Sequence, residues 1–241
     1  MKQPIFTGSG AAIITPFTSE TVDYPALRRL IDFQLLGKTD AIIVCGTTGE
    51  AATMSYVERM RAIETTVRHV DGRVPVIAGT GSNSTENAIT LSKDAALAGV
   101  DALLVVTPYY NKATQLGLVQ HYYAIADAVG LPLIVYHVPS RTGVTIAAET
   151  YAELARHPNI VGAKEASGDL HLVQRVREIC PEDFTLWSGN DEDTAAICLF
   201  GGKGVISVAA NIVPREMHDL TAASMASGVM PSRTTSGICP R

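Results

Sequence analysis

The chain has 241 residues, 46% of them hydrophobic, and a formal net charge of −5. This length can build one large domain with a substantial core, and the composition argues against wholesale disorder. Without a basic stripe, nucleic acid is a poor candidate partner. No apolar run reaches the roughly 20 residues of a membrane span, no secretion signal opens the chain, and the four cysteines form no CxxC pair. We therefore expect a cytoplasmic protein with reduced thiols and no metal site.

Apolar β-type runs alternate with helical patterns along most of the chain. The expected strands are residues 11–16, 40–46, 74–80, 101–108, 131–138, 160–166, 184–189 and 204–210. The expected helices are residues 23–37, 55–70, 84–98, 114–129, 146–156, 169–179, 191–200 and a last one opened by Pro214. Cap residues support several of these boundaries, among them Asp23 at a helix start and the capping box that begins at Ser55.

Eight β-then-α units of even length favour a closed (β/α)8 TIM barrel. Strands that are apolar on both faces agree with a parallel sheet covered by helices. A doubly wound open sheet is the alternative, but no glycine-rich dinucleotide turn follows the first strand. We expect one barrel domain over residues 1–226. Residues 227–241, where Pro231 and Pro240 interrupt any periodicity, are expected to form an irregular or disordered tail.

Residues 159–168, NIVGAKEASG, place a lysine at the end of an apolar strand. If residues 160–164 form a strand, Lys164 and Gly162 share one face while Val161 and Ala163 share the other. An amine fixed at the end of a rigid element suits covalent carbonyl chemistry. The alternative is an ordinary solvated lysine at a strand end.

In such a barrel the functional residues lie at the carboxyl ends of the strands. These ends are expected to form a ring of hydroxyls and glycines around one lysine and one arginine: Thr15, 46–50, 79–81, 107–111, Tyr136, 139–143, Lys164, 188–190 and Ser207. The ring has no cluster of His, Asp and Glu at metal-ligand spacing, which disfavours metal-assisted hydrolysis.

Several members of this ring suit carbonyl chemistry. The turn GTTG at 46–49 can present backbone N–H groups to a small carboxylate, although an ordinary strand-to-helix turn fits equally. Tyr136 is expected to face the barrel interior, either as a proton relay or as a satisfied core tyrosine. Arg141 can bind a carboxylate bidentately or form a surface ion pair.

Lys164 must be neutral to attack a carbonyl. Burial and a nearby cation such as Arg141 lower the pKa of a lysine from its usual value of about 10.4. The resulting Schiff base would let the adjacent carbon lose a proton and become an enamine nucleophile. Tyr136, backed by Thr47 and a second tyrosine, can move those protons. His137 is expected to point away from the interior; the other histidines fall in helices or at helix ends: His69, His121, His157, His171 and His218.

Five segments together resemble the dihydrodipicolinate synthase (4-hydroxy-tetrahydrodipicolinate synthase) family: GTTGE at 46–50, TPYYN at 107–111, PSRTG at 139–143, GAKEASG at 162–168 and GVISV at 204–208. The resemblance covers about residues 5 to 225. It implies a (β/α)8 lyase that condenses pyruvate with L-aspartate 4-semialdehyde in lysine and diaminopimelate biosynthesis. It also implies a covalent Schiff base without a separate cofactor, and a homodimer or homotetramer with no nucleic-acid or membrane partner.

The resemblance assigns roles to single residues. Lys164 would be the Schiff-base lysine, and Tyr136, Thr47 and Tyr110 the proton relay, with Tyr110 lent to the neighbouring subunit's site. The implied substrate-binding residues are Thr48 for the pyruvate carboxylate, Arg141 for the semialdehyde carboxylate, and the backbone of Gly189 and Ile206.

The chain also departs from the family pattern. The family usually has Asn where this chain has His137, and we expect little effect because this residue faces away from the site. Lysine-inhibited members carry two histidines and an acidic residue where this chain has Tyr56, Arg59 and Asn87, so feedback inhibition is not expected. The two candidate allosteric residues that this chain retains are Asn83 and Tyr109.

Family members continue for several helices beyond the barrel, and this chain is expected to lack most of that C-terminal extension, as in a truncation. Two alternative functions follow. One is another class I pyruvate aldolase, a sugar-acid or keto-acid lyase, against which Arg141 argues. The other is a catalytically impaired barrel that only binds a small molecule or a partner.

Overall fold

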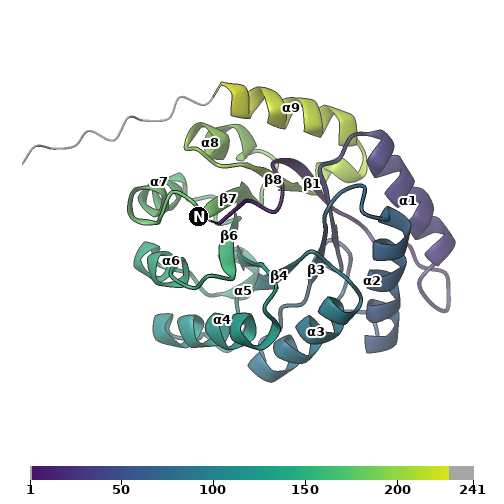
Figure 1. The fold of residues 1–241 in the computed structure, drawn as a ribbon, viewed down its shortest axis with the longest axis horizontal. Helices are drawn as coiled ribbons and strands as arrows, with labels where there is room; N and C mark the ends of the chain where they lie inside the picture. The colour runs from purple at the N-terminus through teal and green to yellow at the C-terminus, as the bar shows by residue number, and fades with distance from the viewer. Residues whose placement is uncertain (1, 228–241) are drawn as a thin grey trace, which may run out of the picture.

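The computed structural model describes residues 2–227. Its centre is a closed barrel of eight parallel strands that follow one another around the ring, with β8 pairing with β1 (Figure 1). The strands are β1 (Gly8–Ala12), β2 (Ala41–Val44), β3 (Val76–Gly79), β4 (Ala102–Val106), β5 (Leu133–His137), β6 (Ile160–Glu165), β7 (Thr185–Ser188) and β8 (Gly204–Ser207). The predicted (β/α)8 TIM barrel is confirmed.

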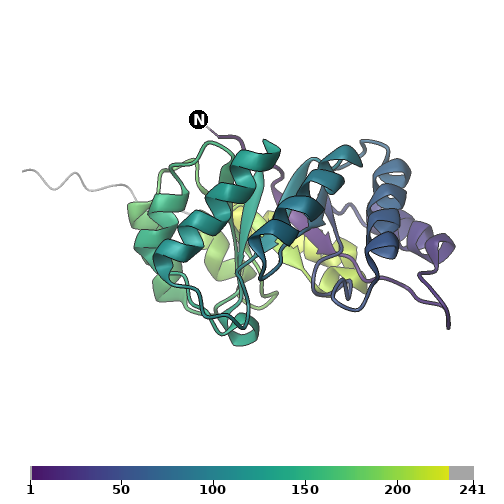
Figure 2. The same ribbon diagram turned by 90° about the horizontal axis from the view of Figure 1, so that it is seen from below.

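Helices surround this barrel on all sides (Figures 1 and 2). They are α1 (Tyr24–Leu36), α2 (Tyr56–Val70), α3 (Thr85–Leu97), α4 (Gln115–Val129), α5 (Pro139–Thr142), α6 (Ala148–Leu154), α7 (Leu170–Ile179), α8 (Thr194–Leu199), the 3-10 helix η1 (Ala209–Asn211) and α9 (Pro214–Ala226). The predicted caps are present: Asp23 accepts the N–H of Ala26, and both arms of the Ser55–Glu58 capping box form.

The predicted boundaries hold for most elements, with two corrections. The first strand was expected at residues 11–16 but lies at Gly8–Ala12, because its sequence, GSGAA, consists of small residues without a β-branched signal. Two short helices, α5 and η1, lie in segments predicted as loop and strand end. Neither is long enough to show helical periodicity.

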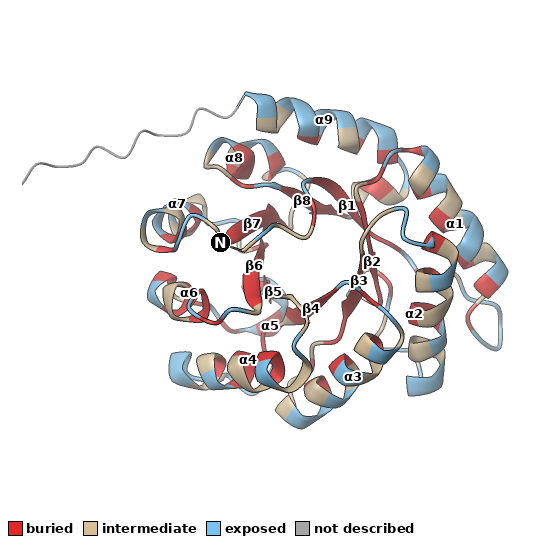
Figure 3. Ribbon diagram, in the orientation of Figure 1, coloured by how far each residue is buried: buried red, intermediate tan, exposed pale blue. Residues whose placement is uncertain are grey.

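Two layers of buried side chains make the core. The inner layer fills the barrel and includes Ile134, Tyr136, Val138 and Trp187, and the outer layer packs the strands against the helices. Figure 3 shows the strands almost entirely buried and the outward faces of the helices exposed. The predicted inward direction of Tyr136 is therefore confirmed.

Strand β6 contains an irregularity just before the lysine. Leu133 pairs with Ile160 and Ile134 pairs with Gly162, so Val161 is an extra residue in the ladder. Val161 consequently joins the inner layer while Ala163 belongs to the outer one. The prediction that these two residues share a face is wrong. Gly162 is required here because a Cβ would lie 2.1 Å from the carbonyl oxygen of Thr185.

Beyond the bulge the register is regular, and Tyr136 lies opposite Lys164. Three of the four cysteines, Cys45, Cys180 and Cys198, are free and buried, while Cys239 lies outside the described residues. The tail predicted at 227–241 also lies outside the described residues, except for Ser227, which is the C-cap of α9. None of the helices in the described part is both long and apolar enough to cross a membrane.

Candidate active site

Lys164 is the second-last residue of β6, lies inside the barrel and is only 4% exposed. Its Nζ atom lies 4.3 Å from the centroid of the Tyr136 ring on the neighbouring strand. An ammonium group is attracted to the face of such a ring. The structure thus brings together the two residues on which the predicted chemistry depends.

The surroundings of Lys164 favour its neutral form. Burial lowers the pKa of Lys164 to about 8; the negative charge of Asp191 opposes this shift and the positive charge of Arg141 adds to it. With that pKa, about a tenth of the molecules carry a neutral amine at pH 7. Burial is the dominant cause, as the position of the lysine in the sequence suggested.

Tyr136 is held as a protonated phenol. Burial raises the pKa of Tyr136, while the positive charge of Arg141 and a hydrogen bond with the Thr47 side chain act in the opposite direction. The hydroxyl group can therefore donate a proton and take it back through a neighbour that stabilises its anion. Thr47 and Tyr136 are thus close together, in agreement with the predicted relay.

A cavity of about 280 Å³ opens beside this pair. The predicted residues that line it are Thr47, Tyr136, Arg141 and Tyr109. Lys164 does not line the cavity itself. It lies against the ring of Tyr136, and Tyr136 does line the cavity. Thr48, Tyr110, Gly189, Ile206 and Asn83 do not line the cavity either.

The turn at residues 46–49 is closed by its own backbone. The N–H of Gly49 donates to the carbonyl of Gly46 (3.1 Å), and the hydroxyl of Thr15 donates to the carbonyl of Gly49 (2.6 Å). Thr47 is exposed and Thr48 is half-buried, so both are open to a ligand. The role of this turn in holding a carboxylate stays a prediction.

Arg141 stands in the last turn of α5, which begins at Pro139 and ends at Gly143 in the left-handed conformation. Its side chain is exposed and, within residues 2–227, forms no ion pair. The alternative of a surface ion pair is therefore not supported. A free guanidinium on the cavity wall can receive a carboxylate bidentately.

Gly189 directly follows β7 and Ile206 lies in β8, and neither lines the cavity. A Cβ at Gly189 would lie 3.1 Å from Cε of Lys164, so the lysine side chain passes directly over this glycine. The N–H of Gly189 donates to the carbonyl of Glu165 (2.7 Å), which fixes β7 against β6 at this level. Ile206 is buried in the inner layer.

Tyr110 is 89% exposed and its backbone is left-handed, with φ of 73°. Its N–H donates to the carbonyl of Thr142 (3.2 Å), which holds the residue beside the Arg141 segment. Within one chain it does not meet Tyr136 at the cavity, and its predicted service to a neighbouring subunit stays a prediction. Asn83 donates to Asn111 (3.1 Å) at the same edge of the barrel.

Two residues near the site escaped the sequence prediction. Asp191 was read only as the start of a helix, yet its carboxylate accepts the N–H groups of Val208 and Ala209 and its charge reaches Lys164. Arg59 was noted only as a departure from the family, yet it lines the cavity and donates to the carbonyl of Gly79 (2.5 Å). No sequence pattern predicts either position, because both residues make their contacts with segments that are distant along the chain.

The histidines agree with their predicted positions. His137 is fully buried between the barrel and the helices, and the structure pairs most of the others with side chains of neighbouring elements. No group of three or more His, Cys, Asp or Glu side chains placed to hold a metal ion occurs in residues 2–227.

In the described part of the chain, a closed (β/α)8 barrel carries a buried lysine, a tyrosine and an arginine without an ion pair at the carboxyl ends of its strands. This arrangement is typical of TIM-barrel enzymes that act on small molecules. Within that class, the chain belongs to the dihydrodipicolinate synthetase family, whose model matches residues 5–230.

Individual relatives in sequence and in structure agree with this family. A 4-hydroxy-tetrahydrodipicolinate synthase from Caldicellulosiruptor saccharolyticus is 55% identical over 218 residues, which is 90% of this chain and 74% of the relative. One from Thermoanaerobacter sp. is 51% identical over 95% of this chain and 78% of the relative. The crystal structure of the dihydrodipicolinate synthase from Thermotoga maritima matches with a TM-score of 0.91 and 43% identity, over 93% of this chain and 77% of that one.

Proposed function

We propose that the protein condenses pyruvate with L-aspartate 4-semialdehyde to give 4-hydroxy-tetrahydrodipicolinate, a step of lysine and diaminopimelate biosynthesis that we expect in the cytoplasm. The proposal rests on the family to which the chain belongs and on the names of its relatives. The single observation in the molecule that carries it is the buried amine of Lys164, against Tyr136, with a pKa lowered to about 8.

In the first half of the reaction the neutral Nζ of Lys164 attacks C2 of pyruvate. The carbinolamine loses water to give a protonated Schiff base, and Tyr136, assisted by Thr47, moves the proton that leaves. The Schiff base withdraws electrons, so the methyl group of pyruvate releases a proton and an enamine forms. We assign binding of the pyruvate carboxylate to the turn that contains Thr48. The backbone groups of Gly189 and Ile206 are assigned to the lining of the pyruvate site.

In the second half the enamine carbon attacks the aldehyde carbon of the semialdehyde, whose oxygen takes up a proton and becomes a hydroxyl group. The amino group of the same substrate then attacks C2, closes the ring and releases Lys164 as a free amine. One water is lost overall. Arg141 is assigned to the carboxylate of the semialdehyde, because its guanidinium is unpaired on the cavity wall.

Trapping tests this proposal directly. Incubation with pyruvate and borohydride is expected to add one reduced pyruvyl group, located by peptide mass spectrometry at Lys164. Lys164→Ala is expected to remove the adduct. An adduct that survives in the variant, or no adduct in the wild-type protein, would contradict the assignment. A coupled assay with and without L-aspartate 4-semialdehyde distinguishes the synthase from a lyase for sugar acids or keto acids.

We further propose that the chain works as a homo-oligomer in which Tyr110 completes the relay of a neighbouring subunit. Its 89% exposure and its position beside the Arg141 segment support this role. Tyr110→Phe is expected to lower turnover, and mixing it with Lys164→Ala chains is expected to restore part of the activity in hybrid oligomers. Asn83 and Tyr109 remain candidate effector residues, for which lysine titration of the activity is the test.

A further inference from the structure

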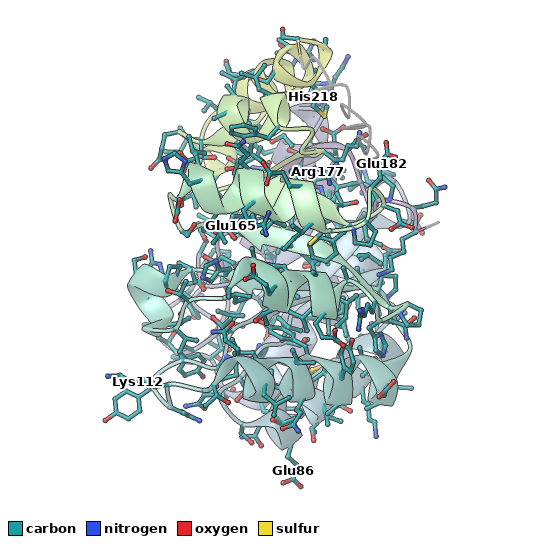
Figure 4. The ribbon with its side chains drawn as sticks, turned by 90° about the vertical axis from the view of Figure 1, so that its left-hand side faces the viewer. Glu86, Lys112, Glu165, Arg177, Glu182 and His218 are labelled. Carbon is teal, nitrogen blue, oxygen red and sulfur yellow. The ribbon has the colours of Figure 1, made fainter. Side chains whose placement is uncertain are left out.

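A fully buried group of polar side chains lies directly behind the candidate site. Glu165 follows Lys164 on β6, His137 follows Tyr136 on β5, and these two residues are partners across the strands. Tyr151 from α6 completes the group. Figure 4 labels Glu165 and views the molecule from the side on which α6 and α7 cover the barrel. The proposed reaction uses none of these three side chains.

Glu165 is a buried carboxylate that is surrounded by donors. Its oxygens accept hydrogen bonds from Nδ1 of His137 (3.0 Å), the hydroxyl of Tyr151 (2.6 Å) and the backbone N–H of Ser167 (2.8 Å). Burial alone would raise the pKa of Glu165, but the interactions with His137, Tyr151 and Ser167 outweigh it and leave the pKa lowered. The carboxylate is therefore ionised and held from three directions.

The contacts of His137 fix its tautomer. Its Nε2 atom accepts the backbone N–H of Ile146 (3.1 Å), so this nitrogen carries no proton. The proton therefore sits on Nδ1, where it donates to Glu165. The imidazole is a neutral bridge, and the interaction with Glu165 is a hydrogen bond to a carboxylate rather than an ion pair.

This bridge reaches the segment that carries Arg141. Residues 138–145 leave β5 immediately after His137 and return at Ile146, which His137 holds through Nε2. One imidazole therefore joins the two ends of the Arg141 segment to each other and, through Glu165, to β6. Tyr151 joins the same carboxylate to α6.

The bulge at Val161 shifts the pairing of β5 and β6 by one residue, and the register beyond it is regular as far as His137 and Glu165. These two residues form the last pair of that ladder and lie just beyond Tyr136 and Lys164. A side-chain bond between the strands at this level fixes the position of the lysine relative to the tyrosine.

We propose that His137, Glu165 and Tyr151 form a positioning network that sets Lys164 against Tyr136 and holds the Arg141 segment over them. The proposal rests on the proposed function for the roles of those three residues. It replaces the expectation, drawn from the direction of its side chain alone, that His137 has little effect on the site. The network touches no substrate and acts only through its neighbours.

Removing one donor should loosen the site in a measurable way. When the strands are less firmly aligned, water reaches Lys164 more easily, and the desolvation that lowers its pKa is reduced. The amine then titrates closer to its ordinary value. In the same variant the Arg141 segment is less fixed, so the KM for the semialdehyde rises more than the KM for pyruvate.

The experiment compares two tyrosine variants. Tyr151→Phe removes only the hydroxyl that donates to Glu165. Tyr123→Phe is the matched control, because the hydroxyl of Tyr123 donates to the backbone carbonyl of Glu153 (2.8 Å), away from the network. Both keep their rings. The rate of pyruvate trapping at Lys164 is followed against pH at a temperature at which thermal melts show every variant to be folded.

For Tyr151→Phe we expect the midpoint of the profile to rise by about one pH unit from about 8, with about tenfold slower trapping at pH 7. The control is expected to follow the wild-type profile. If the Tyr151→Phe profile superimposes on the wild-type profile, the network has no positioning role, whatever happens to the melting temperature.

A second probe separates this inference from the proposed function. Methyl acetimidate modifies neutral amines without any need for pyruvate, and mass spectrometry reports its reaction at Lys164 as a function of pH. Failure of pyruvate to trap the wild-type lysine would count against the proposed function alone. An unchanged acetimidate profile in Tyr151→Phe would count against the positioning network alone.

Discussion

Lys164 and Glu165 are neighbours on one strand and similarly buried, yet their surroundings on the two faces of the barrel favour opposite charge states. Inside the barrel, Lys164 rests on the Tyr136 ring, and burial lowers the pKa of Lys164 to about 8. Outside, Glu165 receives three hydrogen bonds that overcome its burial and keep it ionised. The charged form of Lys164 is destabilised inside the barrel, and the charged form of Glu165 is stabilised outside it.

The difference shows what burial does with and without donors or acceptors. A buried group that lacks partners for its charge gives the charge up and becomes reactive, whereas one with a full set of partners becomes a fixed structural ion. On the proposals made above, β6 carries the reactive amine and a residue that positions it one residue apart. Four predictions test this contrast, in order of decreasing expected effect.

Replacing Lys164, the buried amine inside the barrel, should abolish activity and improve stability. Lys164→Met keeps the volume but removes the amine, so we expect turnover to fall by about 10⁴-fold or more. The variant should unfold at higher temperature than the wild type at pH 7, because no charge is buried. The gap should narrow between about pH 8 and 10.4, where only the unfolded lysine still binds a proton and wild-type stability rises. Thermal melts across this range would contradict the prediction if the gap stayed constant.

Tyr136→Phe should separate proton transfer from packing. The ring still supports Lys164, but the hydroxyl that Thr47 assists is missing, so we expect a loss of about 10² to 10³-fold in kcat. The melting temperature should change little. Comparable losses in kcat and in stability would mean that the hydroxyl is mainly structural. Stopped-flow measurement of Schiff-base formation would locate the affected step.

Arg141→Gln should weaken only the binding of the second substrate. Loss of a bidentate charged contact is expected to raise the KM for the semialdehyde by about 10²-fold. Pyruvate trapping should keep a nearly wild-type rate, because Lys164 loses only one minor influence. Initial rates with each substrate varied in turn provide the test, and an equal rise in both KM values would place Arg141 elsewhere in the mechanism.

Glu165→Gln should cost stability by about 1–3 kcal/mol at pH 7, because an amide cannot accept from all three donors. The pKa of Glu165 is lowered in the folded state, so its contribution is complete above the unfolded value of about 4.3 and is lost as the pH falls through the folded value. Urea denaturation at pH 7 and at several pH values below about 4.3 should show the difference between the two proteins shrinking as the pH falls. A difference that stays constant below about pH 4.3 would mean that Glu165 is not ionised in the folded protein.

Much of the fold follows from local patterns in the sequence. Even spacing of apolar runs, the Ser55 capping box and the N-cap at Asp23 suffice to place seven of the eight strands and most helices. The first strand was misplaced because small residues carry no β-type pattern, and α5 was missed because four residues cannot display periodicity. In both cases tertiary packing defines an element that local sequence does not.

The proximity of Tyr136 and Lys164 was also predictable from the sequence, whereas the contacts that hold them in place were not. Strand alternation is enough to bring Tyr136 and Lys164 together, because each lies near the carboxyl end of its strand and the two strands are neighbours. The bulge at Val161 is invisible in the sequence, and it reverses the face of one residue in that same strand. The contacts of Asp191 and Tyr151 join segments that are distant along the chain, so only the folded molecule reveals them.

The way His137 closes the segment between β5 and Ile146 has a consequence for how this barrel can change. Both ends of the segment are anchored to one side chain that faces away from the substrates. Residues 139–143 can therefore be exchanged as a cassette without moving the strand that carries Tyr136. If Arg141 binds the semialdehyde as proposed, a library confined to these five positions is the natural starting point for redirecting the enzyme to other aldehydes.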